Sequence, residues 1–245
     1  MLDLDTLEYD ILYIALIIFL ASFIQGFTGF GFAIISIPLL SLIINIKEAI
    51  PLAALAGLII NIFLLAQLNK HIKFSELKSL LIGSFIGIPI GAYFLTEADP
   101  KLIKIILGLI ILVFVFFSLT KIIKRTELNL KWGYLFGTIS GVLGGAFNTN
   151  GPPILIYFYL KGWDKFKQKA SITGFFVVTS IIIVSTHALT GITTAAVLSK
   201  FLVSLPAVFI GMFIGSRFFI KISTDTFNRV ILYGLILIAI FMIFR

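Results

Sequence analysis

Near the middle of the chain stands the segment Gly144-Gly145-Ala146-Phe147-Asn148-Thr149-Asn150-Gly151-Pro152-Pro153, inside an apolar run at about 132–160. Glycine adds backbone freedom and proline removes an N–H donor, so an ordinary helix cannot continue through this segment. In lipid, an interrupted backbone is tolerated only where protein buries it or where it lines a polar cavity. The segment is therefore either a structural kink or a binding site built from backbone groups.

A second, simpler copy of this pattern occurs earlier in the chain. It reads Gly26-Phe27-Thr28-Gly29-Phe30-Gly31-Phe32 and is closed by Pro38. Three of its residues stand 115 positions before residues of the same type in the later copy; they are Gly26, Gly29 and Pro38, matched to Gly141, Gly144 and Pro153. The two copies predict an internal repeat of residues 1–125 and 126–245.

Small residues support the same repeat. They recur every fourth position in two places that are 124 residues apart, at Gly83, Gly87 and Gly91 and at Ala207, Gly211 and Gly215. Such small-xxx-small faces let the backbones of neighbouring membrane helices approach closely.

The composition is that of a membrane protein. Of 245 residues, 60% are hydrophobic and 12% are charged, whereas a soluble domain has about 25% charged residues. The lipid bilayer is therefore the expected surrounding. The net charge of +8 is explained by basic loops on one side of a membrane, so no nucleic-acid partner is expected. The absence of cysteine excludes disulfides and thiolate metal sites.

The apolar segments predict an all-α, polytopic helical membrane protein. Residues 11–44 carry no charge and, at about 1.5 Å per residue, are too long for one upright crossing of a roughly 30 Å core. We expect them to form a hairpin of two short arms that meet at 26–31, and residues 132–160 to form a second, re-entrant hairpin. Ordinary transmembrane helices are predicted at about 49–68, 77–95, 102–120, 171–188, 195–216 and 227–244.

The placement of charge favours hairpins that return to the side from which they enter. The basic loops at 121–131 and 161–169 then share one side with most other Lys and Arg residues, 14 against 5. The positive-inside rule makes that side cytoplasmic and puts the acidic N-terminus outside. Each half then crosses the membrane three times, so the two halves are expected to be inverted repeats, a common plan among transporters.

The tips of the two hairpins hold the candidate substrate-binding residues. A helix N-terminus at membrane depth offers unpaired N–H groups and a partial positive charge, which attract a small anion. By inverted symmetry the two tips are expected to face each other and to enclose one site near the midplane. In the alternative interpretation, the glycines and prolines only make tight turns. The candidates are Gln25, Gly26, Thr28, Gly29 and Gly31 in the first tip and Gly144, Gly145, Asn148, Thr149, Asn150, Gly151, Pro152 and Pro153 in the second.

Four further polar residues lie in or near predicted spans. His187 either relays a proton or touches substrate, or it is a hydrogen-bonded structural residue. Arg217 is either an anion gate or a side chain that snorkels to the interface. Asn61 and Gln67 are interpreted as residues that hydrogen-bond between helices.

The sequence carries no sign of an enzyme. No Asp or Glu lies within a predicted span, which argues against a carboxylate relay and against metal chemistry. H-E-x-x-H, G-x-S-x-G, P-loop and cofactor motifs are absent from the sequence. Neither a catalytic residue nor a metal or other cofactor is therefore expected.

The glycine-rich segments resemble those of the sulfite exporter TauE/SafE family. The resemblance covers essentially the whole chain and lies in the segment from Gly26 to Phe32 with Pro38, and in Ser140-Gly141-Val142-Leu143-Gly144-Gly145-Ala146-Phe147 followed by Gly151-Pro152-Pro153. It implies an inner-membrane protein that moves sulfite, sulfoacetate or a related organosulfur anion, usually outward. It also implies that the two tips form the substrate-binding region.

Two function classes remain open at this point. The leading hypothesis is a secondary transporter that binds a small sulfur-containing anion between the two tips and works by alternating access. The alternative is a passive anion or small-solute channel, because aquaporin-type channels share the plan of three spans and a hairpin, repeated and inverted. A membrane enzyme or an assembly factor is a third hypothesis. The sequence does not decide whether the chain forms a homo-oligomer.

Overall fold

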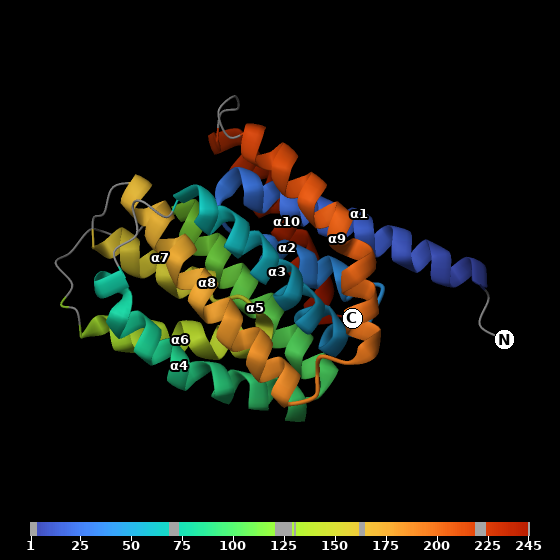
Figure 1. The fold of residues 1–245 in the computed structure, drawn as a ribbon, viewed down its shortest axis with the longest axis horizontal. Coiled ribbons are helices and arrows are strands. Elements are labelled where there is room, and N and C mark those ends of the chain that lie inside the picture. The colour runs from blue at the N-terminus through green and yellow to red at the C-terminus, as the bar shows by residue number, and fades with distance from the viewer. Residues whose placement is uncertain are drawn as a thin grey trace.

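The computed structural model describes residues 4–68, 74–120, 129, 131–161, 165–218 and 224–244 (Figure 1). Most of the loop 121–131, part of the loop 161–169 and the side chain of Gln67 lie outside the described residues. Within the described part the chain is all-helical, as predicted. In chain order the helices are α1 (Leu4–Thr28), α2 (Phe32–Leu40), α3 (Ile46–Leu68), α4 (Phe74–Glu97), α5 (Pro100–Thr120), α6 (Trp132–Phe147), α7 (Gly151–Leu160), α8 (Lys165–Leu189), α9 (Ala195–Phe218) and α10 (Thr224–Phe244).

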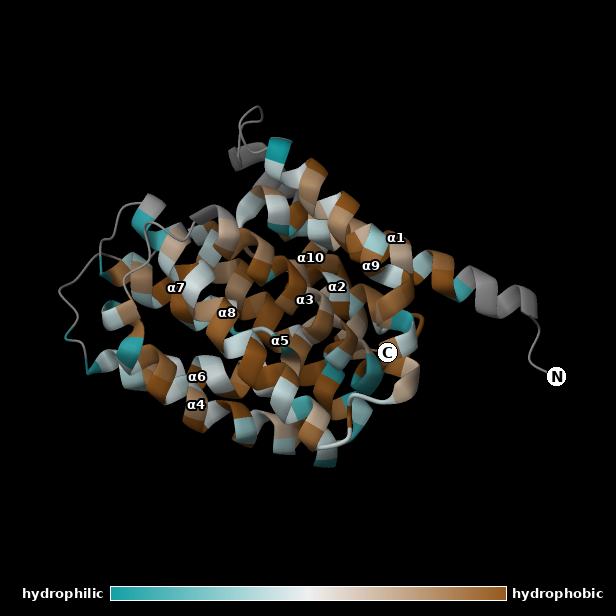
Figure 2. Ribbon diagram, viewed as in Figure 1, coloured by the Kyte–Doolittle hydropathy of each residue, from teal (hydrophilic) through white to brown (hydrophobic). Residues whose placement is uncertain are grey.

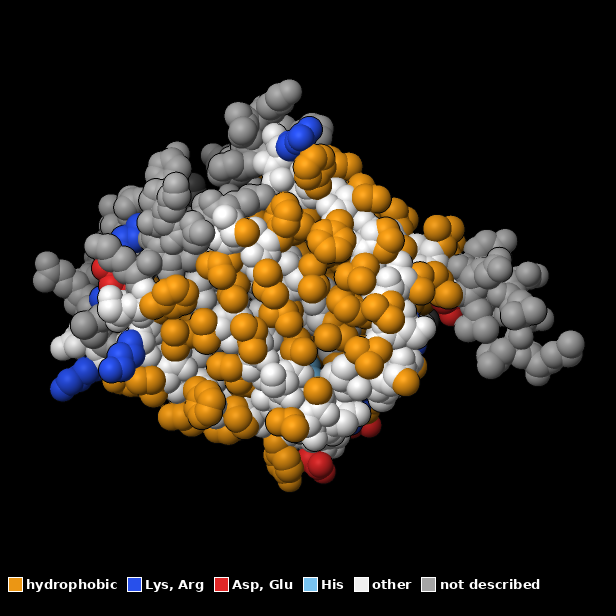
Figure 3. Space-filling model, in the orientation of Figure 1, with side chains coloured by type: hydrophobic (Ala, Val, Ile, Leu, Met, Phe, Trp, Pro, Cys, Tyr) orange, Lys and Arg blue, Asp and Glu red, His pale blue; other side chains and the backbone are white. Residues whose placement is uncertain are grey.

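The long helices are apolar enough to cross a membrane. Figure 2 shows hydrophobic residues along the middle of the helices, and Figure 3 shows hydrophobic side chains across the middle of the visible face, with charged ones near its edges. The chain is therefore a multi-pass helical membrane protein. Within the described residues, six spans meet the criteria of length and composition: Asp10–Thr28, Ile46–Ala66, Phe74–Glu97, Pro100–Thr120, Ala170–Leu189 and Ala195–Arg217. Shorter apolar helices occur at Gly151–Leu160 and Leu232–Phe244.

Both predicted interruptions are present, but they differ in shape. α6 and α7 are short arms of 16 and 10 residues, as expected. The first pair is unequal, because α1 has 25 residues and α2 has 9. Within the predicted hairpin at 11–44, α1 covers residues 11–28 and α2 covers residues 32–40, and α1 also extends back to Leu4. Gly26 remains helical and packs on α9, so that only residues 29–31 leave the helix.

The second pair turns back on itself. The ring of Tyr157 in α7 lies 5.5 Å from that of Phe136, measured between centroids. The same tyrosine is close to Gly133, at the beginning of α6. The end of α7 therefore returns to the beginning of α6, which is the geometry of a hairpin.

Two pairs of helices carry the closest backbone packing. α4 lies along α6 and α1 lies along α9 (Figure 1). A Cβ placed on Gly87 would lie 2.2 Å from the carbonyl oxygen of Thr138, and one placed on Gly215 would lie 2.1 Å from that of Phe23. Glycine is required because no side chain fits between such backbones.

Two close backbone contacts are alike in the two parts of the chain. Gly26 packs on Met212 and Ser216 of α9, and Gly145 packs in the same way on Ile88 and Ala92 of α4. Gly26 and Gly145 are 119 residues apart, whereas the sequence pattern pairs Gly26 with Gly141. The packing register is therefore one helical turn longer than the pattern suggests. α6 has small residues on successive turns, so its pattern matches α1 at more than one shift.

Candidate functional site

Both interrupted tips line one small cavity, which we call the tip cavity. It has a volume of about 40 Å³ and lies between the α1–α2 tip, the α6–α7 tip, α3 and α8. Among the residues that the structure describes, none with a formal charge lines it. Its lining residues are Gln25, Phe30, Gly31, Phe32, Ala33, Ile34, Gly57, Asn61, Asn148, Thr149, Asn150, Gly151, Phe176 and Ser180.

The first tip is built from backbone. Gly29 and Gly31 have positive φ angles of 85° and 102°, a conformation that glycine adopts without strain. The turn directs the N-terminus of α2 at the cavity. The N–H of Phe32 donates to Gln25 Oε1 at 3.1 Å. The next two N–H groups, on Ala33 and Ile34, belong to the first turn and have no intrahelical acceptor.

The second tip is built from side chains. Asn148 adopts the left-handed conformation with φ 51° and caps α6. Asn148 also lines the cavity. Thr149 is 2% exposed, and its hydroxyl lacks a partner within the part of the chain that the structure describes. Asn150 Nδ2 donates to Thr179 Oγ1 at 2.9 Å.

A chain of hydrogen bonds joins the first tip to the second half. Gln25 Nε2 donates to Asn61 Oδ1 at 3.0 Å, and Asn61 Nδ2 donates to Ser180 Oγ at 3.3 Å. The Ser180 hydroxyl in turn donates to the carbonyl of Phe176. Because a buried amide without partners is costly, this chain fixes the orientation of both amides at the cavity wall.

About half of the predicted site residues lie on the cavity. Gln25, Gly31, Asn148, Thr149, Asn150 and Gly151 line it. The other seven do not belong to its wall: Gly26, Thr28, Gly29, Gly144, Gly145, Pro152 and Pro153.

Five of these seven have other surroundings that the contacts define. Gly26 and Gly145 pack against backbone, and the Thr28 hydroxyl bonds within the first tip, to Ile24 and Phe30. Pro152 and Pro153 line a separate apolar cleft of about 800 Å³ between α5, α6 and α7. Because proline has no N–H, α7 presents fewer anion-binding donors than its position at the tip suggests.

Of the lining residues that were not among the predicted site residues, Gly57, Asn61 and Ser180 come from α3 and α8 and face the tips. Asn61 is interpreted from sequence only as an interhelical hydrogen-bonding residue, and Gly57 and Ser180 carry no signal of their own. The spacing of Gly57 and Asn61, four residues apart on one helix face, is consistent with a shared environment. Their position opposite the tips becomes evident only from the packing of α3 against α8.

The two candidate gate residues lie away from the tip cavity. His187 is fully buried, and its Nε2 lies 2.8 Å from the carbonyl oxygen of Gly145, a geometry in which the ring N–H donates. Arg217 is exposed at the end of α9, where its guanidinium carbon lies 4.3 Å from the centroid of the Phe213 ring. The described residues contain no cluster of three or more potential metal ligands.

A cavity between two interrupted helices, inside a multi-pass helical protein, is an arrangement that is common among transporters. The chain belongs to the sulfite exporter TauE/SafE family, because the sequence model of that family matches residues 14–242. It is 24% identical over 225 residues to a protein named "Probable sulfite/organosulfonate exporter TauE" from Cupriavidus necator, across 85% of this chain and 84% of that one. No solved structure matches the chain.

Proposed function

We propose that this chain is a secondary transporter that exports a small sulfur-containing anion, such as sulfite or a small organosulfonate. The anion binds in the tip cavity and reaches either side of the membrane by alternating access. The name of the related exporter supports the substrate class. The observation that carries the proposal is the meeting of both tips at one small cavity that Gln25, Asn61, Asn148 and Asn150 help to line.

The chemistry of the cavity suits an anion that must also leave. Its donors are the N–H groups at the start of α2, the Asn148 amide and the Thr149 hydroxyl. Helix N-termini and amides stabilise negative charge without a formal positive charge. A neutral site of this kind binds an anion less tightly than an arginine would, and therefore releases it more readily.

The size of the cavity favours a compact ligand. At about 15 Å³ for each water, a volume of about 40 Å³ holds two or three water molecules. We therefore expect sulfite to fit this conformation better than a long organosulfonate.

The architecture proposed for this function is a pair of inverted repeats in the inner membrane. The parallel pairs α4–α6 and α1–α9 are equivalent under exchange of the two halves, which supports the repeat. The N-terminus lies outside and the basic loops at 121–131 and 161–169 lie in the cytoplasm, because of the unequal distribution of Lys and Arg.

Uptake of labelled sulfite into proteoliposomes tests the proposal. Saturable uptake that thiosulfate or sulfoacetate inhibits, and that chloride does not, is the expected result. Flux of chloride or water that does not saturate would support the passive channel instead. Saturable uptake of sulfate with no effect of the other sulfur anions would overturn the proposed substrate class.

A further inference from the structure

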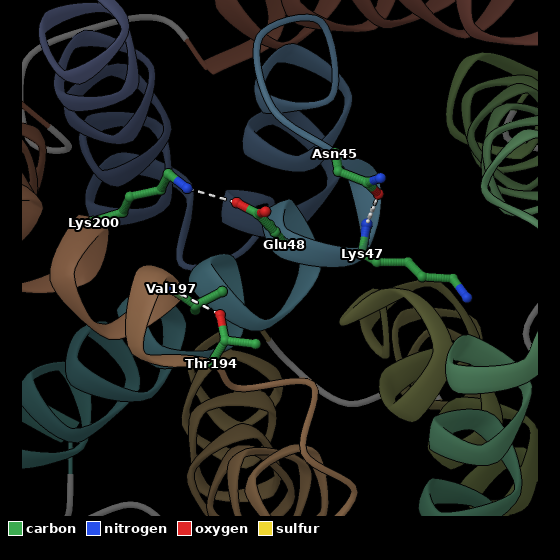
Figure 4. A network of polar contacts seen from close by, with 6 residues as sticks. All are labelled: Asn45, Lys47, Glu48, Thr194, Val197 and Lys200. Carbon is green, nitrogen blue, oxygen red and sulfur yellow. Dashed lines mark hydrogen bonds and ion pairs between the residues drawn. The ribbon is translucent and has the colours of Figure 1, made fainter. Parts of the chain in front are cut away.

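Two ion pairs join the first half of the chain to the second. Glu48 Oε2 in α3 lies 2.6 Å from Lys200 Nζ in α9 (Figure 4). Glu76 Oε2 in α4 lies 2.7 Å from Lys167 Nζ in α8. No other ion pair is present within the described residues, although many Lys and Arg side chains of the chain lie outside them.

The two ion pairs occupy equivalent places in the two halves. Glu48 and Lys167 are 119 residues apart, which is also the separation of the hydrogen-bonded Asn61 and Ser180 on the same two helices. Glu76 and Lys200 are 124 residues apart, as are Gly87 and Gly211 on α4 and α9. If the two halves are superposed, each ion pair therefore falls on the other, with the glutamate of one pair at the position of the lysine of the other.

The ion pairs lie at opposite ends of the helices. α4 begins near Glu76 and ends near Thr96, and the carbonyl of Thr96 accepts a hydrogen bond of 2.7 Å from Lys47 Nζ. Lys47 is adjacent to Glu48 at the beginning of α3. The Glu48–Lys200 pair thus lies at the end of α4, on what we call the α3 face. The Glu76–Lys167 pair lies at its beginning, on what we call the α4 face.

The α3-face pair is held by two capped helix starts. Asn45 Oδ1 accepts the N–H of Lys47 at 2.9 Å, and Thr194 Oγ1 accepts that of Val197 at 3.3 Å (Figure 4). These are side-chain caps at the beginnings of α3 and α9. The caps fix the first turns of the two helices that carry Glu48 and Lys200. The two side chains therefore lose little conformational entropy when they form the ion pair.

We propose that the two ion pairs are the gates of the transport cycle, one on each face. The Glu48–Lys200 pair opens when the tip cavity faces the α3 side, and the Glu76–Lys167 pair opens when it faces the α4 side. In this structure both pairs are formed. This inference rests on the proposed transport function and names residues that carry its conformational step.

The exposure of these side chains suits a gate. They are between 27% and 38% exposed, so solvent screens the pairs and each contributes little to overall stability. A small energy is sufficient to bias two conformations of similar free energy. We therefore expect neutralisation of one pair to change the populations of the two open states several-fold without unfolding the protein.

Because the chain has no cysteine, a single introduced thiol reports access to the tip cavity. Ala33→Cys places one on the cavity wall and keeps the backbone N–H of that position. Labelling with a membrane-impermeant thiol reagent is measured from each side of oriented vesicles, in the Ala33→Cys background. Glu48→Gln should raise the rate from the α3 side about three-fold or more and lower it from the α4 side. Lys167→Gln should do the reverse.

Matched controls separate gating from loss of charge alone. Lys47→Gln removes a cation on the α3 face that bonds only within the first half among described residues, and Lys78→Gln removes an exposed one near the beginning of α4. Neither should change the sidedness of labelling. Equal rates in the parent and both gate variants, or a change in the same direction for both, would overturn the proposal.

A charge exchange keeps the test decisive if a neutralised variant does not fold. Glu48→Lys combined with Lys200→Glu should restore parental labelling, whereas Glu48→Lys alone should not; failure of the exchange would count against the gate. The labelling requires no transported substrate. It therefore separates an error about the gates from an error about the anion, which the sulfite uptake measurement detects.

Discussion

Both tips interrupt a helical segment and line the tip cavity, but they present different chemical groups to it. The first leaves its helix through Gly29 and Gly31, and its polar contribution is the N-terminus of α2 with Gln25 behind it. The second leaves through Asn148 and presents an amide and a hydroxyl, while Pro152 and Pro153 remove donors from the first turn of α7. Gly29 and Asn148 are 119 residues apart, the register of the packing.

This difference indicates how one cavity acquires complementary donors. A backbone N-terminus gives a diffuse positive potential that accepts anions of several shapes. Fixed side-chain donors distinguish anions by the positions of their oxygens. We infer that the first tip supplies affinity and the second supplies selectivity, and the predictions below test this division.

The largest effect is expected where the two tips are alike, in their close packing. Gly26→Val and Gly145→Val should each reduce the amount of folded protein at least ten-fold. A Cβ at these positions would lie 2.6 Å and 2.1 Å from backbone oxygens that cannot move aside. Gly234→Val is the matched control, because no atom lies within 4 Å of a Cβ placed there. Size-exclusion profiles of the three variants provide the comparison, and normal yield of the first two would contradict the packing.

Asn148→Gly tests the side-chain tip. Glycine keeps the left-handed backbone but removes the amide, so the fold should survive. Loss of a hydrogen bond to a charged ligand costs about 1.5–3 kcal/mol, which corresponds to about 10- to 150-fold in sulfite affinity. The KM for sulfite uptake measures this change. An unchanged KM in folded protein would show that Asn148 is only a helix cap.

Gln25→Leu and Ser140→Ala compare the supports of the two tips. Gln25 accepts the Phe32 N–H and donates to Asn61, whereas the Ser140 hydroxyl donates to the Asn150 carbonyl alone, at 2.7 Å. Each buried group left without a partner costs about 1–3 kcal/mol, so Gln25→Leu should lower thermal stability more. Thermal unfolding in detergent gives the two values. A larger loss of thermal stability in Ser140→Ala than in Gln25→Leu would show that the Ser140 hydrogen bond is the more important of the two.

Thr149→Val should give the smallest effect and separates binding from folding. The Thr149 hydroxyl is buried without a partner among described residues, so an isosteric methyl should leave stability unchanged or slightly higher. Sulfite affinity should fall several-fold if the hydroxyl donates to the anion. Lower stability together with unchanged affinity would assign the hydroxyl a structural role.

The sequence predicts the fold better than it predicts the site. Interruptions at Gly29–Gly31 and at Asn148–Asn150 follow from residues that cannot remain helical, and the apolar lengths predict the spans. The position at which α1 ends does not follow, because Gly26 stays helical and packs on α9. Asn61 and Ser180 reach the cavity through the packing of α3 on α8, which no local pattern records. Glycines that pack between helices and glycines that line a cavity look the same in sequence.

Counterflow of sulfite in proteoliposomes tests the central claim, that both tips form the binding site of a carrier. Vesicles loaded with unlabelled sulfite are diluted into a trace of labelled sulfite, and internal label is followed with time. We predict a transient accumulation above equilibrium that is strongly reduced by Asn148→Gly and unchanged by Lys78→Gln. Entry of label without accumulation, equal in the parent and in Asn148→Gly, would contradict the account and favour a passive pore.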